Sequence, residues 1–194
     1  MKAVLITGSP RKHGNTSFVG SSISKLLTAG GWKVKKIELH DLDFSGCIGC
    51  ERCRRDNRCS GIEDDLTPYY SMLEDSALWI LGSPVHNYNV TSWMKAFIDR
   101  LYCYYIFQPT VPRQYSSVLQ NRGKKAVVYA VAEQTNEKDF GFAVEAMKLP
   151  LEALGIDVVG SYRFPGYFEG DALSKDTHKI EQFSAQFRKL IDNI

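Results

Sequence analysis

The chain has 194 residues, a length typical of one compact domain, and its usage of apolar, charged, glycine and proline residues excludes a disordered, collagen-like or coiled-coil protein. Its 24 lysines and arginines exceed its 22 aspartates and glutamates by two, a net charge of +2 that is too small to indicate nucleic-acid binding or a polybasic membrane-binding face. No apolar run is long enough to cross a membrane, and no secretory signal precedes the first apolar segment, so we expect a cytoplasmic protein.

Apolar runs and segments with helical spacing alternate along the chain. Continuous apolar runs predict strands buried on both faces, and the alternating charged and apolar residues of 33–39 predict an outer strand with one wetter face. In chain order the sequence predicts a strand at 3–7, a helix at 19–29, a strand at 33–39, a helix at 63–75, a strand at 77–81, a helix at 94–105, a loop at 108–123, a strand at 124–131, a helix at 142–154, a strand at 156–159 and a helix at 175–194.

This order of strands and helices predicts an α/β fold, a doubly wound parallel sheet with helices on both faces. No linker or internal repeat divides the chain, so we expect a single domain over 1–194. Ligands of such sheets bind beyond the carboxyl ends of the strands. The predicted site therefore lies in the loops that open at Gly8, Leu39, Gly82 and Val131.

The loop after the first predicted strand, residues 8–17, places hydroxyls, an amide and cations before a helix. Free backbone N–H groups and the positive end of the helix dipole meet at such a turn, so it is typical of an anion site. The loop lacks the Gly-Lys-Ser/Thr ending of a P-loop and the G-x-G-x-x-G of a dinucleotide site. It suits a monophosphate, as in a flavin mononucleotide (FMN) site; the alternative is a helix N-cap with a solvated basic loop. The candidate phosphate-binding residues are Ser9, Arg11, Asn15, Thr16 and Ser17.

The loop after the third predicted strand, residues 82–89, combines amide side chains, an aromatic residue and a proline that stiffens the backbone. A flavin ring needs backbone N–H and C=O groups at its pyrimidine edge and an apolar or aromatic neighbour. The alternative is a polar loop that caps the helix after Thr91. The candidate ring-binding residues are Pro84, Val85, His86, Asn87 and Tyr88. Because a flavin itself performs the redox chemistry, we assign no catalytic side chain.

Four of the five cysteines follow the spacing Cys47-x2-Cys50-x2-Cys53-x5-Cys59. Three thiols at intervals of three residues can surround one corner of a cubane iron-sulfur cluster, with a fourth supplied a few residues on. The arginines between positions 52 and 58 would lower thiol pKa values and stabilise an anionic cluster. Zinc is the competing metal, although four-thiolate zinc sites usually come as two separated pairs. Free or redox-active thiols are the third interpretation.

The two loops together resemble the NADPH-dependent FMN reductases of flavodoxin-like fold. The resemblance is carried by Gly8-Ser9-Pro10-Arg11 with Asn15-Thr16-Ser17, by Gly82-Ser83-Pro84-Val85 and by Lys95-Ala96-Phe97-Ile98-Asp99-Arg100. It is strong over roughly the first half of the chain and continues as element order alone in the second half. It implies a five-stranded parallel sheet of order 2-1-3-4-5, FMN as cofactor and NAD(P)H as a candidate electron donor.

The cysteine spacing after the second predicted strand resembles the iron-sulfur flavoproteins, a branch of that family. The resemblance implies a cysteine-rich insertion at 43–62, in which Cys47, Cys50, Cys53 and Cys59 hold a [4Fe-4S] cluster. It also implies assembly as a homodimer or homotetramer in which a cluster approaches the flavin of a neighbouring subunit.

The first functional hypothesis is an FMN-dependent oxidoreductase that passes electrons between FMN, a [4Fe-4S] cluster and a redox partner protein. The second is a cluster-free NAD(P)H-dependent flavin or quinone reductase, because a nicotinamide stacked on a flavin needs no dinucleotide motif. A third hypothesis, of another class, is a non-enzymatic electron carrier or a redox sensor that uses the thiols.

Overall fold

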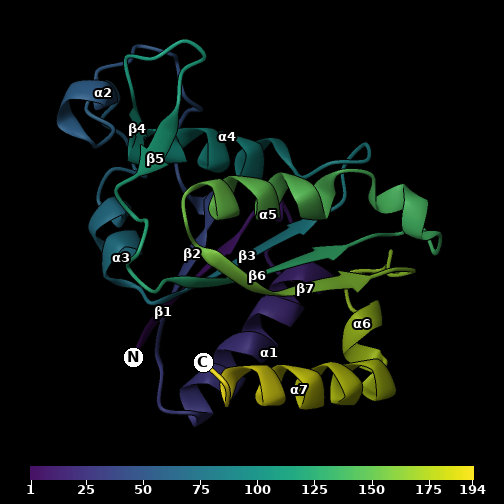
Figure 1. The fold of residues 1–194 in the computed structure, drawn as a ribbon. Helices are drawn as coiled ribbons and strands as arrows, with labels where there is room; N and C mark the ends of the chain where they lie inside the picture. The colour runs from purple at the N-terminus through teal and green to yellow at the C-terminus, as the bar shows by residue number, and fades with distance from the viewer.

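A five-stranded parallel sheet forms the centre of the chain, whose computed structural model describes all of residues 1–194 (Figure 1). The sheet contains β1 (Lys2–Thr7), β2 (Lys33–Glu38), β3 (Leu78–Pro84), β6 (Lys125–Val131) and β7 (Asp157–Phe164). Its strand order is β2-β1-β3-β6-β7, and every neighbouring pair is parallel. This confirms the predicted order 2-1-3-4-5, because β6 and β7 are the fourth and fifth strands of the sheet in chain order.

Helices cover both faces of the sheet, as Figure 1 shows. The face drawn below carries α1 (Asn15–Ala29), α6 (Ala172–Lys175) and α7 (Thr177–Ile191), and the face drawn above carries α3 (Tyr69–Asp75), α4 (Ser92–Arg100) and α5 (Ala143–Ala153). Short helical segments also occur at α2 (Cys53–Asp56), η1 (Leu39–Asp41), η2 (Leu101–Tyr104) and η3 (Glu137–Phe140). Because the crossovers place helices on the two faces, the central strands are buried on both sides.

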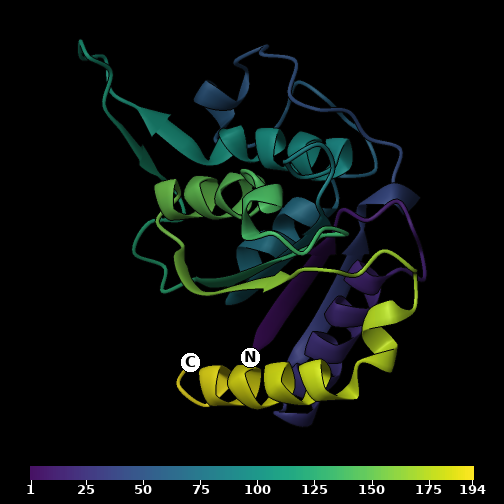
Figure 2. The same cartoon turned by 90° about the vertical axis from the view of Figure 1, so that its right-hand side faces the viewer.

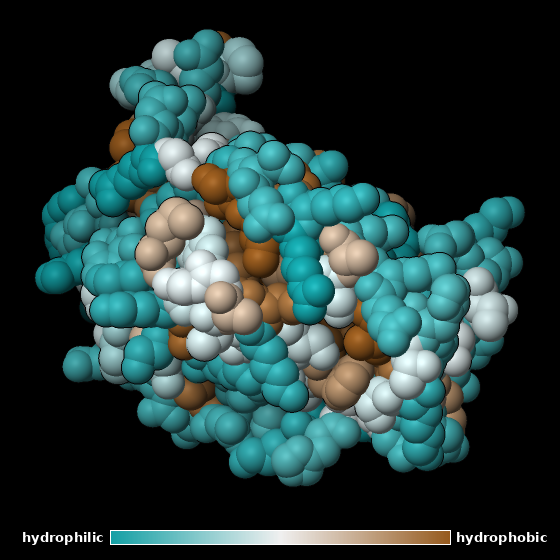
Figure 3. All heavy atoms as spheres, turned by 90° about the horizontal axis from the view of Figure 1, so that it is seen from below, coloured by the Kyte–Doolittle hydropathy of each residue, from teal (hydrophilic) through white to brown (hydrophobic).

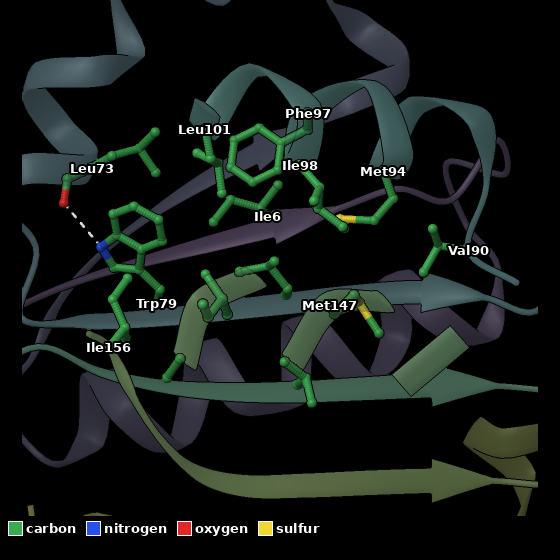
Figure 4. Close-up of a cluster of buried hydrophobic side chains, with 14 of the residues drawn as sticks. Ile6, Leu73, Trp79, Val90, Met94, Phe97, Ile98, Leu101, Met147 and Ile156 are labelled. Atoms are coloured by element: carbon green, nitrogen blue, oxygen red, sulfur yellow. Dashed lines mark hydrogen bonds between the residues drawn. The ribbon is translucent and has the colours of Figure 1, made fainter. Parts of the chain in front are cut away.

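Alternation of side chains along β3 divides the interior into two cores. Trp79 and Leu81 belong to the core under α4 and α5, whereas Leu78 and Ile80 belong to the core over α1 and α7. Figure 4 shows the first of these cores, where apolar side chains of α4 lie over the sheet. The indole N–H of Trp79 donates to the Leu73 carbonyl over 2.9 Å, so the polar atom of this fully buried ring is satisfied.

Two predicted helices are shorter than the apolar spacing indicates. The segment 63–75 becomes helical only at Tyr69, because Pro68 has no N–H and is accommodated at the start of a helix rather than within it. The predicted helix 94–105 ends at Arg100 and continues as the turn η2, so Tyr105 lies in a strand and not on the helix.

The predicted loop 108–123 contains part of a hairpin. Strand β4 (Tyr105–Phe107) pairs antiparallel with β5 (Tyr115–Ser117), and Figure 2 shows this hairpin extending away from the body of the molecule. The rings of Tyr105 and Tyr115 meet edge to face with centroids 5.3 Å apart, and Tyr102 packs against Phe107 with centroids 5.4 Å apart. Contacts between aromatic rings across the hairpin therefore stabilise it, and such cross-strand pairs leave no periodic signal in the sequence.

The surface seen from below in Figure 3 is mainly hydrophilic, with smaller apolar areas near its centre. No helix is long and apolar enough to span a bilayer.

The C-terminal end of α3 is capped by a buried lysine from the segment before β6. Lys124 is only 5% exposed, and its ammonium donates to the carbonyls of Leu73, Glu74 and Ser76 over 3.2, 2.5 and 2.7 Å. The ammonium also lies 5.9 Å from the centroid of the Trp79 ring. Lys124 thus gives the Glu74 and Ser76 carbonyls at the end of this helix a donor, and adds a further one for Leu73.

We predict that Lys124→Met lowers the free energy of unfolding by about 1–3 kcal/mol, because it leaves buried carbonyls without a donor. The matched control is Lys125→Met, since the neighbouring Lys125 side chain forms no hydrogen bond or ion pair and its substitution should change stability by less than about 0.5 kcal/mol. Urea unfolding of both variants measures the difference, and equal effects would show that the lysine cap does not stabilise α3.

Candidate functional site

A hollow opens at the carboxyl edge of the sheet, where both candidate loops and two further loops meet. It is lined by Ser9, Pro10, Arg11, Gly14, Asn15, Thr16, Pro84, Val85, His86, Val131, Glu133, Tyr167 and Phe168. The loops after β1 and β3 form one wall each, as predicted from their positions after parallel strands. The other walls come from the loops after β6 and β7.

The loops after β1 and β3 are fixed to each other by a network centred on Thr91. Gly8 donates its N–H to the Gly82 carbonyl over 2.8 Å, and the Thr91 hydroxyl donates to the Gly8 carbonyl over 2.6 Å. The same hydroxyl caps α4 by accepting the Met94 N–H. A Cβ at Gly8 would lie 2.7 Å from the Met94 Cβ, so only glycine allows this close approach of loop and helix.

The first turn of α1 presents unpaired backbone donors to the hollow. The N–H groups of Asn15, Thr16 and Ser17 have no acceptor within the protein, and no acidic residue lies in this turn. All three residues are nevertheless at least nine-tenths buried. A 15-residue helix directs the positive end of its dipole to the same place. Unpaired buried N–H groups at such a point can bind an anion of phosphate size.

A buried tyrosine positions this turn against the sheet. The Tyr129 hydroxyl donates to the Thr16 carbonyl over 3.0 Å, and burial raises the pKa of this phenol far above its usual range, so it stays protonated. A Cβ at Gly82 would lie 2.0 Å from the Tyr129 ring. The glycine of the second loop therefore makes room for the ring that supports the first.

Asn15 connects the first loop to residues 165–173, the segment after β7. Its amide nitrogen donates to the carbonyls of Tyr167 and Glu169 over 3.2 and 2.7 Å, and its amide oxygen accepts the Leu173 N–H over 3.0 Å. The side chain predicted to bind phosphate is thus engaged within the protein, and Asn15 offers a ligand only its backbone N–H. Sequence reasoning missed this segment because it ended the last strand at 159, five residues before Phe164, where β7 ends.

Arg11 is attached to the same segment. Its guanidinium donates to the Phe168 carbonyl over 3.2 Å and lies 5.7 Å from the centroid of the Phe168 ring. The Arg11 carbonyl in turn accepts the hydroxyls of Ser9 and Ser17, each over 3.1 Å. The predicted phosphate loop is therefore a compact turn, and the Arg11 guanidinium lies at the surface of the hollow.

The loop after β3 forms a tight turn over 84–89. His86 and Asn89 exchange backbone hydrogen bonds of 2.8 and 3.0 Å, and Asn87 and Tyr88 between them have left-handed φ angles of 46° and 61°. Of the five predicted ring-binding residues, the first three line the hollow, whereas Asn87 and Tyr88 do not, and Tyr88 is 61% exposed. The backbone N–H groups of Asn87 and Tyr88 have no acceptor within the protein.

The four clustered cysteines line a second, smaller hollow, together with Arg100, Tyr102 and Cys103. None of the five cysteines forms a disulfide, and Cys103 is buried in the core. A Cβ at Gly61 would lie 2.2 Å from the Cys50 sulfur, so a side chain at this position would displace the thiol. The spacing that suggested a shared site thus corresponds to one shared hollow.

Thiols are close enough in this hollow to influence one another. Burial raises the pKa of Cys53, and the neighbouring Cys59, Cys47 and Cys50 raise it further. Four thiols form a soft donor set that suits iron-sulfur or zinc binding. The four sulfurs share this hollow, but no three cysteine, histidine or carboxylate side chains in the structure are positioned to hold one metal ion.

Comparison with known proteins places the chain among flavin-dependent reductases. Residues 1–134 match the family described as NADPH-dependent FMN reductase. Over its full length the chain is 33% identical to an iron-sulfur flavoprotein of Archaeoglobus fulgidus, of which it covers 81%. An iron-sulfur flavoprotein of Methanocaldococcus jannaschii is 33% identical over 100 residues, which are 52% of this chain and 51% of that protein.

The fold is also that of a solved flavin enzyme. An FMN-dependent NADH-azoreductase of Bacillus anthracis, solved in complex with FMN, aligns with a TM-score of 0.65 over 97% of this chain and 100% of that one. At 16% identity this likeness establishes the shared fold alone.

We predict that Asn15→Ala accelerates amide hydrogen exchange across 165–173 by about tenfold or more in the cofactor-free protein, because this segment loses three hydrogen bonds to the first turn of α1. Ser17→Ala is the matched control, since its hydroxyl bonds only within the first loop. Unchanged exchange in Asn15→Ala would show that this side chain does not hold the segment.

Proposed function

The chain belongs to the NADPH-dependent FMN reductase family and to its iron-sulfur flavoprotein branch, and from this premise we propose that it passes electrons between FMN, a [4Fe-4S] cluster and a redox partner. The activity of an FMN-dependent oxidoreductase follows from the family itself. The observation that carries the proposal is the meeting of the free N–H groups of α1 with the turn after β3 in one hollow.

The phosphate of FMN would bind at the start of α1. The backbone N–H groups of residues 15–17 are the donors, and the hydroxyls of Ser9 and Thr16 lie in the wall beside them. Arg11 supplies a positive charge near a dianionic group, held in place by Phe168. Because these donors are already oriented by the fold, binding requires little rearrangement.

The flavin ring would lie against residues 84–88. Pro84 and Val85 provide an apolar wall, and the free N–H groups of Asn87 and Tyr88 suit the carbonyl groups of the pyrimidine edge. When bound, FMN accepts a hydride from a donor such as NAD(P)H and can release the two electrons singly. The protein's contribution is to bind and orient this ring, which is why no side chain is assigned as an acid or base.

Cys47, Cys50, Cys53 and Cys59 would hold the cluster, whose role is to accept and donate one electron at a time. Their common hollow and soft donor set support this proposal, as do the names of the relatives. We also propose that the chain acts as a homodimer or homotetramer, in which a cluster can approach a neighbouring flavin.

A second candidate is a cluster-free NAD(P)H-dependent flavin or quinone reductase. It is favoured by the arrangement of the cysteines, no three of which are set to hold a metal ion. In this case the thiols would have a structural or regulatory role, and the site after β1 and β3 would be unchanged.

We predict that the flavin-free protein binds FMN about 100-fold more tightly than riboflavin, a difference of about 2.8 kcal/mol that charge-assisted bonds to the phosphate readily supply. Thr16→Asp should remove most of this preference, because it places a negative charge among the donors. Ser24→Asp, later on the same helix, should retain it. Flavin fluorescence titrations measure both ligands, and equal affinity for FMN and riboflavin in the unaltered protein would contradict the phosphate site.

A further inference from the structure

A buried ion pair lies beneath the cysteine segment. Arg100, the last residue of α4, has a fully buried side chain, and Asp64 is 12% exposed. The two groups pair in a fork, with one guanidinium nitrogen 2.5 Å and the other 3.2 Å from the two carboxylate oxygens. Burial alone would raise the pKa of Asp64, but the hydrogen bonds from Arg100 and from the Ser45 N–H hold it below its usual range.

This pair joins the two ends of the cysteine segment. Arg100 donates to the Ser45 carbonyl over 3.0 Å, and the Ser45 N–H donates to Asp64 over 3.3 Å. Next to this pair, Asp43 and Asp65 exchange hydrogen bonds of 2.8 and 3.3 Å. All four clustered cysteines lie between these fastened ends, so the ion pair closes the base of the loop that carries them.

Arg100 also faces the cysteines themselves. It lines the same hollow as the four thiols. The arginines between positions 52 and 58 lie on the outside; Arg55, for example, is 81% exposed and pairs with Asp56. Arg100 is therefore a buried cation in the wall of this hollow, and solvent does not screen its charge.

Stability alone does not account for this pair. Burying two charges costs several kcal/mol in desolvation, and well-packed apolar residues usually stabilise a core at least as well. What an apolar pair cannot provide is a directional bond to Ser45 or a charge next to the thiols.

We propose that Asp64 and Arg100 are positioning residues: the pair clamps the ends of residues 45–64 so that the four cysteines share one hollow, and Arg100 is the buried counter-charge of the bound cluster. The clamp is independent of the proposed function, whereas the counter-charge rests on it.

The clamp is tested in metal-free protein by amide hydrogen exchange. Arg100→Gln and the double variant D64N/R100Q should each accelerate exchange across 45–64 by about tenfold or more relative to β6, because both lose the guanidinium that donates to the Ser45 carbonyl and pairs with residue 64. The double variant removes both charges and should recover much of the overall stability that Arg100→Gln loses, which separates loop release from global unfolding. Arg55→Gln is the control and should leave exchange unchanged. Normal exchange across 45–64 in a folded Arg100→Gln protein would overturn the clamp.

The counter-charge is tested by redox titration with dithionite after anaerobic reconstitution with iron and sulfide. Uptake of one electron adds one negative charge beside Arg100, so Arg100→Gln should shift the midpoint potential of the cluster to a more negative value. Arg100→Lys, which keeps the charge, should stay near the unaltered protein, as should Arg55→Gln. Equal potentials in Arg100→Gln and Arg100→Lys would overturn the counter-charge. If the unaltered protein takes up no iron, the proposed function fails, while the exchange experiment still decides the clamp.

Discussion

The site depends on three backbone N–H groups that the first turn of α1 leaves unpaired at the carboxyl edge of the sheet. Buried donors without acceptors are costly, and they persist here because the surrounding structure fixes the turn from several sides. Tyr129 holds it from the sheet, Asn15 ties it to the segment after β7, and Gly8 and Gly82 allow helix and ring to approach. A phosphate would supply the missing acceptors, so the stability of this turn and the binding of FMN are two aspects of one arrangement.

Much of this arrangement was predictable because it is local in sequence. The alternation of strands and helices and the two loops follow from apolar runs and from glycine, proline and hydroxyl residues directly after them, whereas the strand order was implied by the family resemblance. The structure has this order and brings the two loops into one hollow. Contacts between distant residues were not predictable. The use of the Asn15 side chain to hold residues 167–173, and the aromatic pairing of Tyr105 with Tyr115, join segments whose partners the sequence does not reveal. The start of α3 at Tyr69 reflects Pro68, a residue that the sequence already places in the first turn of a helix or at a break in it.

The cysteine segment lies outside the sheet, between β2 and α3. Its two ends meet where Arg100 of α4 and Asp64 close the loop, and its middle contacts the scaffold through Arg54, which donates to the Tyr102 hydroxyl and lies over the Phe107 ring. The spacing of the cysteines suggests a common site, but it does not reveal the ion pair beneath them. Arg100 lies 41 residues after Cys59, the last of the four clustered cysteines. The fixed loops at the carboxyl edge of the sheet and the ion pair at the base of the cysteine segment are the two features on which the proposed conversion of two-electron into one-electron transfer rests.

The most direct test of this account is the stoichiometry of iron, acid-labile sulfide and flavin in protein purified without oxygen, together with its visible spectrum. We expect about four iron and four sulfide for each FMN, the content of one cubane cluster. Flavin without iron or sulfide would contradict the two-centre account and leave a cluster-free reductase, and protein that binds no flavin would contradict the assignment of the hollow itself.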